Sequence, residues 1–375
     1  MAEMDRIDEA VQLWANRPKD IQKSDDSIVK YRHYTLRRLS FILICILSAF
    51  FVAGYAMTIG DYSLSFTEVY DYIWRHITDS IDSTDIREVR ADYIVWDMRF
   101  PRICTGLIAG AALGAAGAVM QSILRNPLAD PYTTGISSGA SFGASLAMGV
   151  GITIAGMGYA IVVNAFIFAL VPMMIIILVS KLRGASPTTM IMAGIAVMYI
   201  FNAMTTLIKL WADADTLAAI YAWSVGSIDG SSWERVSLML PITLIGMVIL
   251  QILSKRLNVL STGDESARSM GVDANKLRII CLLIVSLMSA AIVSFTGLIG
   301  FIGLVCPHIA RLVIGSDNRF LIPASAAFGA ALLLLADCVG RLIIPGVTIQ
   351  VGVITAFIGA PLFLYLIVKQ KKETW

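Results

Sequence analysis

Long apolar stretches recur along almost the whole 375-residue chain, and they constrain its fold more than any other feature. Most are close to the roughly 20 residues that a helix needs to cross a bilayer. Only 15% of the residues are charged, against about a quarter in soluble domains. We therefore predict an all-helical integral membrane protein with about ten transmembrane helices, at residues 41–60, 103–124, 135–157, 159–180, 188–210, 236–254, 277–296, 298–314, 321–343 and 349–368.

The stretch at 103–124 is unusually rich in glycine and alanine. A glycine inside the helix of a soluble protein costs roughly 1 kcal/mol relative to alanine. In a bilayer, small residues instead let helix backbones approach closely, because packing drives helix association there. We therefore expect this stretch to be a closely packed transmembrane helix.

Lysine and arginine are unevenly distributed over the segments between the apolar stretches. With ten spans and an N-terminus inside the cell, 21 of the 29 basic residues fall on inner segments and 8 on outer ones. Basic residues collect on the cytoplasmic side of membrane proteins, so we predict that both termini are cytoplasmic. The chain then divides into a cytoplasmic tail at 1–38, a transmembrane domain at 39–370 and a short tail at 371–375.

The polar stretch before Phe41 is too long for the n-region of a secretory signal. The first apolar stretch is therefore expected to remain as a transmembrane helix. Within the tail, Ile7, Val11 and Trp14 share one face if this segment is helical, and a largely disordered tail is the alternative.

The longest external loop, at 61–98, contains an amphipathic pattern with Ser65 and Thr67 near its start. Its aromatic content suits the outer membrane interface, so we predict a helix that lies along that interface. The polar segment that follows is expected to face outward. The apolar positions at helical spacing are Phe66, Val69, Tyr70, Ile73, Trp74 and Ile77.

The largest cytoplasmic loop, at 255–276, is predicted to hold a short helix over about 263–270. Thr262 and Glu265 fit a capping box, and Gly271 can end the helix. Asp273 is then placed to cap the next span. Such a helix is either a simple turn or a contact site for a soluble subunit.

Several classes of enzyme and carrier are excluded by missing motifs. The chain has no G-x-x-x-x-G-K-[ST] motif, and its three histidines form no HExxH motif. Asp337 is the only acid deep in a late span, whereas a proton-coupled carrier needs more. The five cysteines lie in apolar spans and are expected to be buried free thiols. We expect a conduit that is not an enzyme, binds no metal or other cofactor, has no nucleic-acid partner and takes its energy from elsewhere.

Seven motifs then follow one another in order, and together they resemble the FecCD-type permeases, the membrane subunits of ABC importers for iron–siderophore, haem and cobalamin. The resemblance covers about residues 40–370. One departure is Thr348-Ile-Gln350, where the family usually has Glu-Leu-Pro. The motifs are Arg99-Phe-Pro-Arg102, Gln121 with Arg125-Asn-Pro-Leu-Ala-Asp-Pro131, Gly135-Ile-Ser-Ser-Gly-Ala140, Gly263-Asp-Glu-Ser-Ala-Arg-Ser-Met-Gly271, Gly297-Leu-Ile-Gly-Phe-Ile-Gly-Leu-Val-Cys-Pro-His-Ile-Ala-Arg311, Ala336-Asp-Cys-Val-Gly-Arg341 and Gly352-Val-Ile-Thr-Ala-Phe-Ile-Gly-Ala-Pro361.

The resemblance implies the fold of a type II ABC importer permease in the cytoplasmic (inner) membrane, with ten helices per subunit. It implies a homodimer with the pathway at its interface, although a heterodimer with a paralogue stays open. Two cytoplasmic ATPase subunits would bind ATP and Mg²⁺, and an external substrate-binding protein would deliver the ligand. We favour an iron(III)–siderophore as that ligand. A cobalamin or haem is the nearest alternative, ahead of molybdate, tungstate or a stand-alone carrier.

The resemblance also assigns roles to individual residues. Arg99, Arg102 and Arg341 would dock the binding protein, whereas the residues alone favour interfacial arginines at Arg99 and Arg102 and an Asp337–Arg341 pair. The predicted ATPase-coupling residues are Gly263, Asp264, Glu265, Ser266, Ala267, Arg268, Met270 and Gly271. The predicted cytoplasmic gate is Ser186, Pro187 and Thr188, where Ser186 also fits a helix N-cap and Pro187 the first helical position. Candidate pathway-lining residues are Tyr199, Asn202, Thr205, Gln350 and Thr355.

Overall fold

The computed structural model describes residues 18–154, 156, 158–344 and 346–369, and this part of the chain is a helical bundle. The predicted face of Ile7, Val11 and Trp14 and the tail at 371–375 lie outside it. The elements are α2 (Pro18–Ala56), α3 (Phe66–Ile77), α4 (Ile86–Tyr93), the π-helix η1 (Ile94–Arg99), α5 (Phe100–Leu124), the 3-10 helix η2 (Pro131–Thr134), α6 (Ile136–Ser145), the π-helix η3 (Leu146–Val150), α7 (Ala160–Arg183), α8 (Pro187–Trp211), α9 (Ala214–Val225), α10 (Trp233–Ser261), α11 (Asp264–Ser269), α12 (Ala274–Thr296), α13 (Ile302–Ile314), α14 (Asn318–Leu342) and α15 (Val351–Lys369).

The all-helical prediction is confirmed, whereas the count of ten spans is not. Within the described residues, seven helices are long and apolar enough to cross a membrane, and each coincides with a predicted span. The predicted spans at 135–157, 298–314 and 349–368 correspond instead to shorter apolar helices, at 136–150, 302–314 and 351–365. The cytoplasmic position of both termini stays a prediction.

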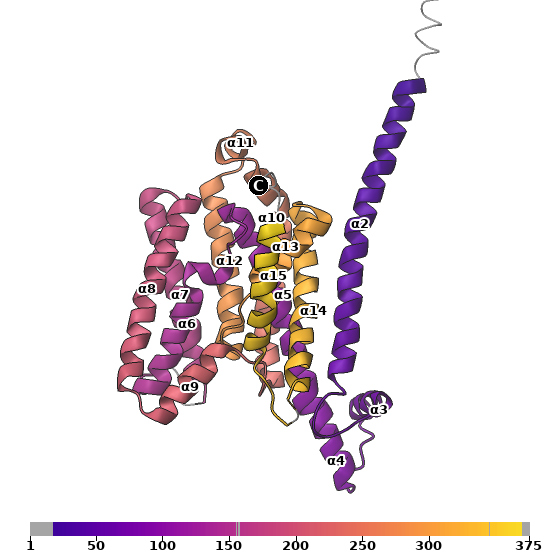
Figure 1. Cartoon of the computed structure of the whole chain (residues 1–375), viewed down its shortest axis with the longest axis vertical. Coiled ribbons are helices and arrows are strands. Elements are labelled where there is room, and N and C mark those ends of the chain that lie inside the picture. Colours follow the sequence, from indigo (N-terminus) through magenta and orange to yellow (C-terminus); the bar gives the residue numbers. More distant parts are fainter. Residues whose placement is uncertain (1–17, 155, 157, 345, 370–375) are drawn as a thin grey trace, which may run out of the picture.

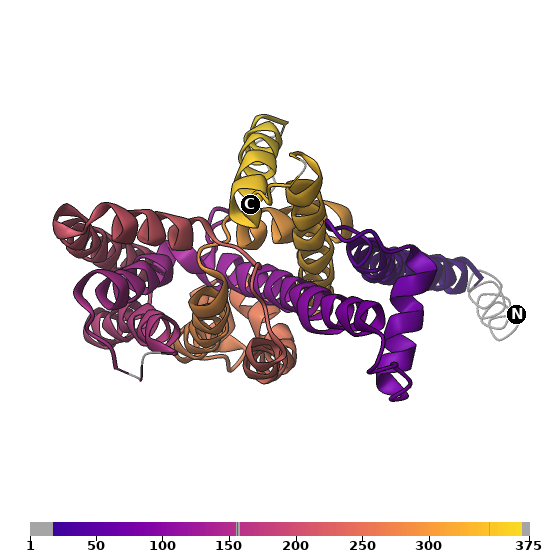
Figure 2. The ribbon, with the colours of Figure 1, turned by 90° about the horizontal axis from the view of Figure 1, so that it is seen from below.

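Helix α5 lies in the middle of the bundle and contacts α10, α12, α13 and α14 (Figure 1). Helix α2 lies along α14 at one edge, and α6, α7 and α8 form a group on the other side. Helix α15 stands out from one face (Figure 2). We call the end of the bundle that carries α11 the α11 end, and the end that carries α3, α4 and α9 the α3 end (Figure 1).

The close packing predicted for the glycine-rich stretch is confirmed. Twenty of the 25 residues of α5 are buried. A Cβ atom added at Gly110 would lie 2.3 Å from the carbonyl oxygen of Gly329 in α14, and one added at Gly117 would lie 1.8 Å from that of Gly303 in α13. Because real Cβ atoms never approach backbone so closely, only glycine permits these helix contacts.

Two segments are more helical than expected. The segment at 86–98 is helical, because α4, η1 and α5 form one continuous helix over Ile86–Leu124. Residues 18–38 are helical as well, because α2 begins at Pro18. The assignment of these segments to an external loop and a cytoplasmic tail stays a prediction. Helix α9 was not predicted, although Asp213 caps it in the ordinary way by accepting a hydrogen bond from the amide of Thr216.

The predicted amphipathic helix is confirmed as α3. Its N-cap is Ser65, whose side chain and that of Glu68 form a capping box. Val69 is buried, whereas Trp74 is 66% exposed. The exposed aromatic face is what a helix at a membrane interface requires. The five cysteines are free, as predicted, and Cys104 alone among them is only partly buried.

We predict that Gly117→Ala destabilises the protein although it raises helix propensity. Propensity alone favours alanine by about 1 kcal/mol, but the new methyl group meets the backbone of Gly303, and overpacking of this kind costs about 1–3 kcal/mol. Thermal unfolding in detergent measures the effect. Gly158→Ala is the control, because no atom lies within 4 Å of a Cβ there. Equal melting temperatures for the two variants would contradict the prediction.

Candidate functional site

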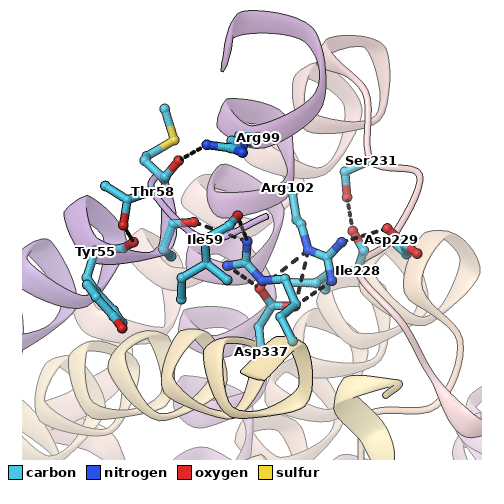
Figure 3. Close-up of polar contacts among 12 residues, drawn as sticks. Tyr55, Thr58, Ile59, Arg99, Arg102, Ile228, Asp229, Ser231 and Asp337 are labelled. Atoms are coloured by element: carbon cyan, nitrogen blue, oxygen red, sulfur yellow. Dashed lines mark hydrogen bonds and ion pairs between the residues drawn. The ribbon is translucent and has the colours of Figure 1, made fainter. Parts of the chain in front are cut away.

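A cluster of charged residues lies at the α3 end, with Asp337 of α14 at its centre (Figure 3). Its other members are Arg99, Arg102, Asp229 and Arg341. The guanidinium of Arg102, in α5, donates from Nη2 to Asp337 Oδ1 at 2.8 Å and from Nη1 to Asp229 Oδ1 at 2.6 Å. Arg341 Nη2 lies 2.9 Å from Asp337 Oδ2. The side chain of Asp337 is 2% exposed, so two cations surround one buried carboxylate. We call these residues the Asp337 cluster.

Two arginines of this cluster also donate to backbone carbonyls in the segment at 56–62, where α2 ends and the chain leaves it. Arg99 donates to two carbonyl oxygens at 2.7 and 2.6 Å, and Arg341 Nη1 donates to two others at 3.1 and 3.0 Å. The last carbonyls of a helix lack partners within it, and Arg341 supplies one for Ala56, the last residue of α2. The acceptors are Met57 and Tyr62 for Arg99, and Ala56 and Ile59 for Arg341.

The structure therefore turns the three predicted docking arginines inward. Arg99 is 7% exposed, and the side chains of Arg102 and Arg341 are 13% and 8% exposed, so none is a freely exposed interfacial cation. The alternative Asp337–Arg341 pair is confirmed. Docking of a binding protein stays a prediction. The carboxylate of Asp229, 61% exposed, is the part of the cluster that reaches the surface.

At the α11 end, the predicted short helix is confirmed as α11, but its predicted capping box is wrong. The N-cap is Gly263, with no side-chain cap, and the hydroxyl of Thr262 donates to the carbonyl of Val259 instead. Gly271 follows the helix with φ +79° and donates to the carbonyl of Arg268. Asp273 caps α12 as predicted, by accepting a hydrogen bond from the amide of Lys276.

Helix α11 is held through its first residue and exposes the opposite face. The carboxylate of Asp264 accepts hydrogen bonds from Arg278 at 2.7 and 2.8 Å and pairs with Arg125. The Arg278 guanidinium holds the pKa of this carboxyl below its usual range. Among the predicted coupling residues Ala267 is buried, whereas the exposed ones are Glu265, Ser266, Arg268, Met270 and Gly271.

The predicted gate residues lie at the start of α8. The hydroxyl of Ser186 accepts a hydrogen bond from the amide of Thr189 at 3.1 Å, and Pro187 occupies the first turn. This confirms the predicted N-cap and the predicted position of the proline. Thr188 is exposed. The preceding residue, Ala185, is buried, and its carbonyl accepts a hydrogen bond from Arg278 at 3.2 Å.

The five residues predicted to line the pathway differ in exposure, and their role in a pathway stays a prediction. Thr205 and Thr355 are buried, and their hydroxyls donate to carbonyls of their own helices, at Phe201 and Gly352. Tyr199 and Asn202 are exposed on α8, and Gln350 is half-buried just before α15. The hydroxyls of these two threonines are therefore hydrogen-bonded within their own helices.

A cleft of about 700 Å³ lies instead between α6, α9, the segment before α13, and α15. None of the five predicted pathway residues lines it. Its polar side chains are Ser137 and Ser224, and the aromatic residues Tyr132, Phe301 and Phe357 also line it. Three of these residues lie within motifs of the sequence: Ser137 in 135–140, Phe301 in 297–311 and Phe357 in 352–361. The motifs therefore border the cleft, but they do not show which side chains face it.

Close backbone contacts fix the walls of this cleft. The amide of Ser227 donates to the carbonyl of Thr296 at 2.7 Å, and that of Gly352 donates to Gly226 at 3.1 Å. A Cβ at Gly352 would lie 1.7 Å from the carbonyl oxygen of Val225. The end of α9, the loop after α12 and the start of α15 thus meet backbone to backbone.

We predict that Asp337→Asn destabilises the protein by about 3 kcal/mol, because it leaves two buried arginines without their shared anion. Asp229→Asn is the matched control and should cost less than about 1 kcal/mol, since that carboxylate is largely exposed. Unfolding of the detergent-solubilised protein by titration with SDS measures both. Similar unfolding midpoints for both variants would show that the cluster does not depend on Asp337.

The chain was compared with known families, proteins and structures. The model of the FecCD transport family matches residues 42–369. A protein of Methanocaldococcus jannaschii assigned as an ABC transporter permease is 40% identical over 353 residues, 92% of this chain and 98% of that protein. The cobalamin import system permease protein BtuC of Halobacterium salinarum is 39% identical over 204 residues, 54% of each chain. A solved inward-facing transporter assigned to the metal-chelate type has a TM-score of 0.77 at 30% identity, covering 88% of this chain and 99% of that one.

Because the family model spans most of the length of this chain, the chain belongs to the FecCD transport family.

Proposed function

We propose that this protein is the permease subunit of a type II ABC importer that moves a metal chelate, an iron(III)–siderophore, across the cytoplasmic membrane. The observation that carries the proposal is α11: a short helix at one end of the bundle, anchored by Asp264 and exposing a mixed charged and apolar face. Membership of the FecCD family supports it, because that family is one of transport permeases, which are not enzymes themselves.

The energy for transport comes from ATPase subunits that bind ATP and Mg²⁺ and dock on α11. An extracytoplasmic binding protein delivers the chelate at the α3 end, where Asp229 and the guanidinium of Arg102 lie near the surface. A second copy of the chain completes the pathway. The α15 face, which stands out from the bundle and borders the cleft, is the surface that we assign to this second copy.

The cleft suits a bulky, largely apolar chelate with a few polar groups. Its volume of about 700 Å³ lies within the range of small-molecule sites, and aromatic rings and hydroxyls are typical of their walls. Related permeases are named for iron(3+)-citrate in Bacillus subtilis and for hemin in Yersinia pestis. A haem or a cobalamin is therefore the second candidate ligand. Retention of one chelate by the cognate binding protein decides between these candidates.

We predict that Met270→Asp abolishes association with the ATPase subunit without unfolding the permease. Met270 is 55% exposed beside α11, and a carboxylate there would be desolvated on docking. Co-purification from mild detergent with the cognate ATPase measures the association. Arg183→Ala, an exposed change elsewhere on the α11 end, is the control and should leave it intact. The proposed function fails if the unmodified chain never retains an ATPase subunit.

Docking of the binding protein can be tested at Asp229, because charge reversal of the buried arginines would disturb folding. Asp229→Asn releases Arg102 from one of its two carboxylates, so Arg102 becomes freer to meet a carboxylate on the binding protein. We expect the affinity for the binding protein to rise by about two- to fivefold, which corresponds to the free energy of one exposed ion pair. The gain should shrink at high salt. Surface plasmon resonance at two salt concentrations measures it, and a loss of affinity at both would contradict a docking role for Arg102.

A further inference from the structure

Arg278, near the start of α12, has the largest fully buried side chain in the described part of the chain. A guanidinium has five N–H donors in a rigid plane. Four hydrogen bonds from Arg278 reach three segments that are far apart in sequence. The three partners are the carbonyl of Ile123 at the end of α5, the carbonyl of Ala185 before α8, and the carboxylate of Asp264 in α11.

The distances place one side chain at the junction of these segments. Nε lies 2.9 Å from the carbonyl oxygen of Ile123. Nη1 lies 3.2 Å from that of Ala185 and 2.8 Å from Asp264 Oδ2, and Nη2 lies 2.7 Å from Asp264 Oδ1. The same guanidinium therefore holds both the exposed helix α11 and the residue that immediately precedes Ser186.

A buried cation cannot easily give up such partners. An unpaired buried donor costs about 1–3 kcal/mol, and a buried charge that loses its counter-ion costs more. A displacement of α11 that keeps the pair with Asp264 must therefore move Arg278, and with it the carbonyl of Ala185. Arg125 also pairs with Asp264, but its other bond runs to Leu260 of α10, away from α8.

We propose that Arg278 is the positioning residue that makes α11 and the gate segment at 186–188 move together. The inference rests on the proposed function, in which an ATPase docks on α11. Arg278 touches neither the chelate nor ATP. It acts because one planar group binds the docking helix and the segment before α8 at the same time, and lysine, with a single ammonium, cannot keep this set of bonds.

Hydrogen exchange of the permease–ATPase complex in nanodiscs tests this, with and without ATP, Mg²⁺ and vanadate. In the unmodified chain we expect the ATPase to slow exchange at 264–271, and nucleotide to change exchange at 184–190 by at least about threefold. In Arg278→Lys the protection of α11 should persist, because its exposed face is unchanged, while the nucleotide response at 184–190 is lost. Arg319→Lys is the control and should respond normally, since the ion pair of Arg319 is with Asp317, at the start of α14.

The alternatives give different results. A normal response at 184–190 in Arg278→Lys overturns the inference. So does simultaneous loss of protection at both segments, which would indicate a structural role alone. Absence of α11 protection in the unmodified complex would instead contradict the proposed function. Asp264→Asn is the second variant, to be used if Arg278→Lys does not fold. It weakens the pair between Asp264 and Arg278 by removing the charge of the carboxylate. An unchanged nucleotide response at 184–190 in Asp264→Asn also overturns the inference.

Discussion

Helices in a bilayer gain little hydrophobic energy from association, because the lipid tails around them are as apolar as their own side chains. In this protein the compensating interaction is backbone contact along α5. Glycines of α5 lie against the carbonyls of Ser325 and Gly329 in α14 and of Gly303 in α13, at separations that no other residue permits. The contacts place α14 and α13 around a common axis. The Asp337 cluster depends on that placement, because Arg102 comes from α5 and both Asp337 and Arg341 come from α14.

Polar junctions at the two ends of α5 complete this arrangement. At the α3 end Arg102 of α5 meets Asp337 of α14, and at the α11 end the carbonyl of Ile123 accepts a hydrogen bond from Arg278 of α12. Neither junction contributes much by charge alone, since burial of ions offsets much of their attraction. Their effect is on geometry: an arginine with several fixed donors allows few relative positions of the helices that it joins.

The sequence predicted the helices and their packing better than it predicted contacts between helices. The lengths of the apolar stretches located the spans, and the small residues of α5 correctly predicted that its backbone lies close to neighbouring helices. Local caps at Ser65, Ser186 and Asp273 were also visible, because their partners lie two or three residues away. The inward turn of Arg99 and the role of Arg278 were not visible. Their acceptors include backbone carbonyls of apolar residues such as Met57 and Ala185. Every residue has such a carbonyl, so the sequence does not show which of them will accept a hydrogen bond. The capping box at Thr262 failed for a related reason, because α11 takes Gly263 as its N-cap and its first acid is engaged by two distant arginines.

The two junctions differ in how far their central acids can move. Asp337 belongs to a helix of 25 residues that lies backbone to backbone on α5, so the Asp337 cluster has no freedom apart from that of the bundle. Asp264 belongs to a helix of six residues bounded by Gly263 and Gly271, both with positive φ. A force applied to α11 therefore meets less resistance than one applied at the α3 end. The carboxylate of Asp264 joins α11 to two arginines, which lead to different helices. The other partners of Arg278 are the end of α5 and the segment before α8, whereas the other partner of Arg125 is the carbonyl of Leu260 in α10. The position of α11 therefore depends on these side-chain contacts, whereas that of Asp337 depends on backbone packing along α5 as well.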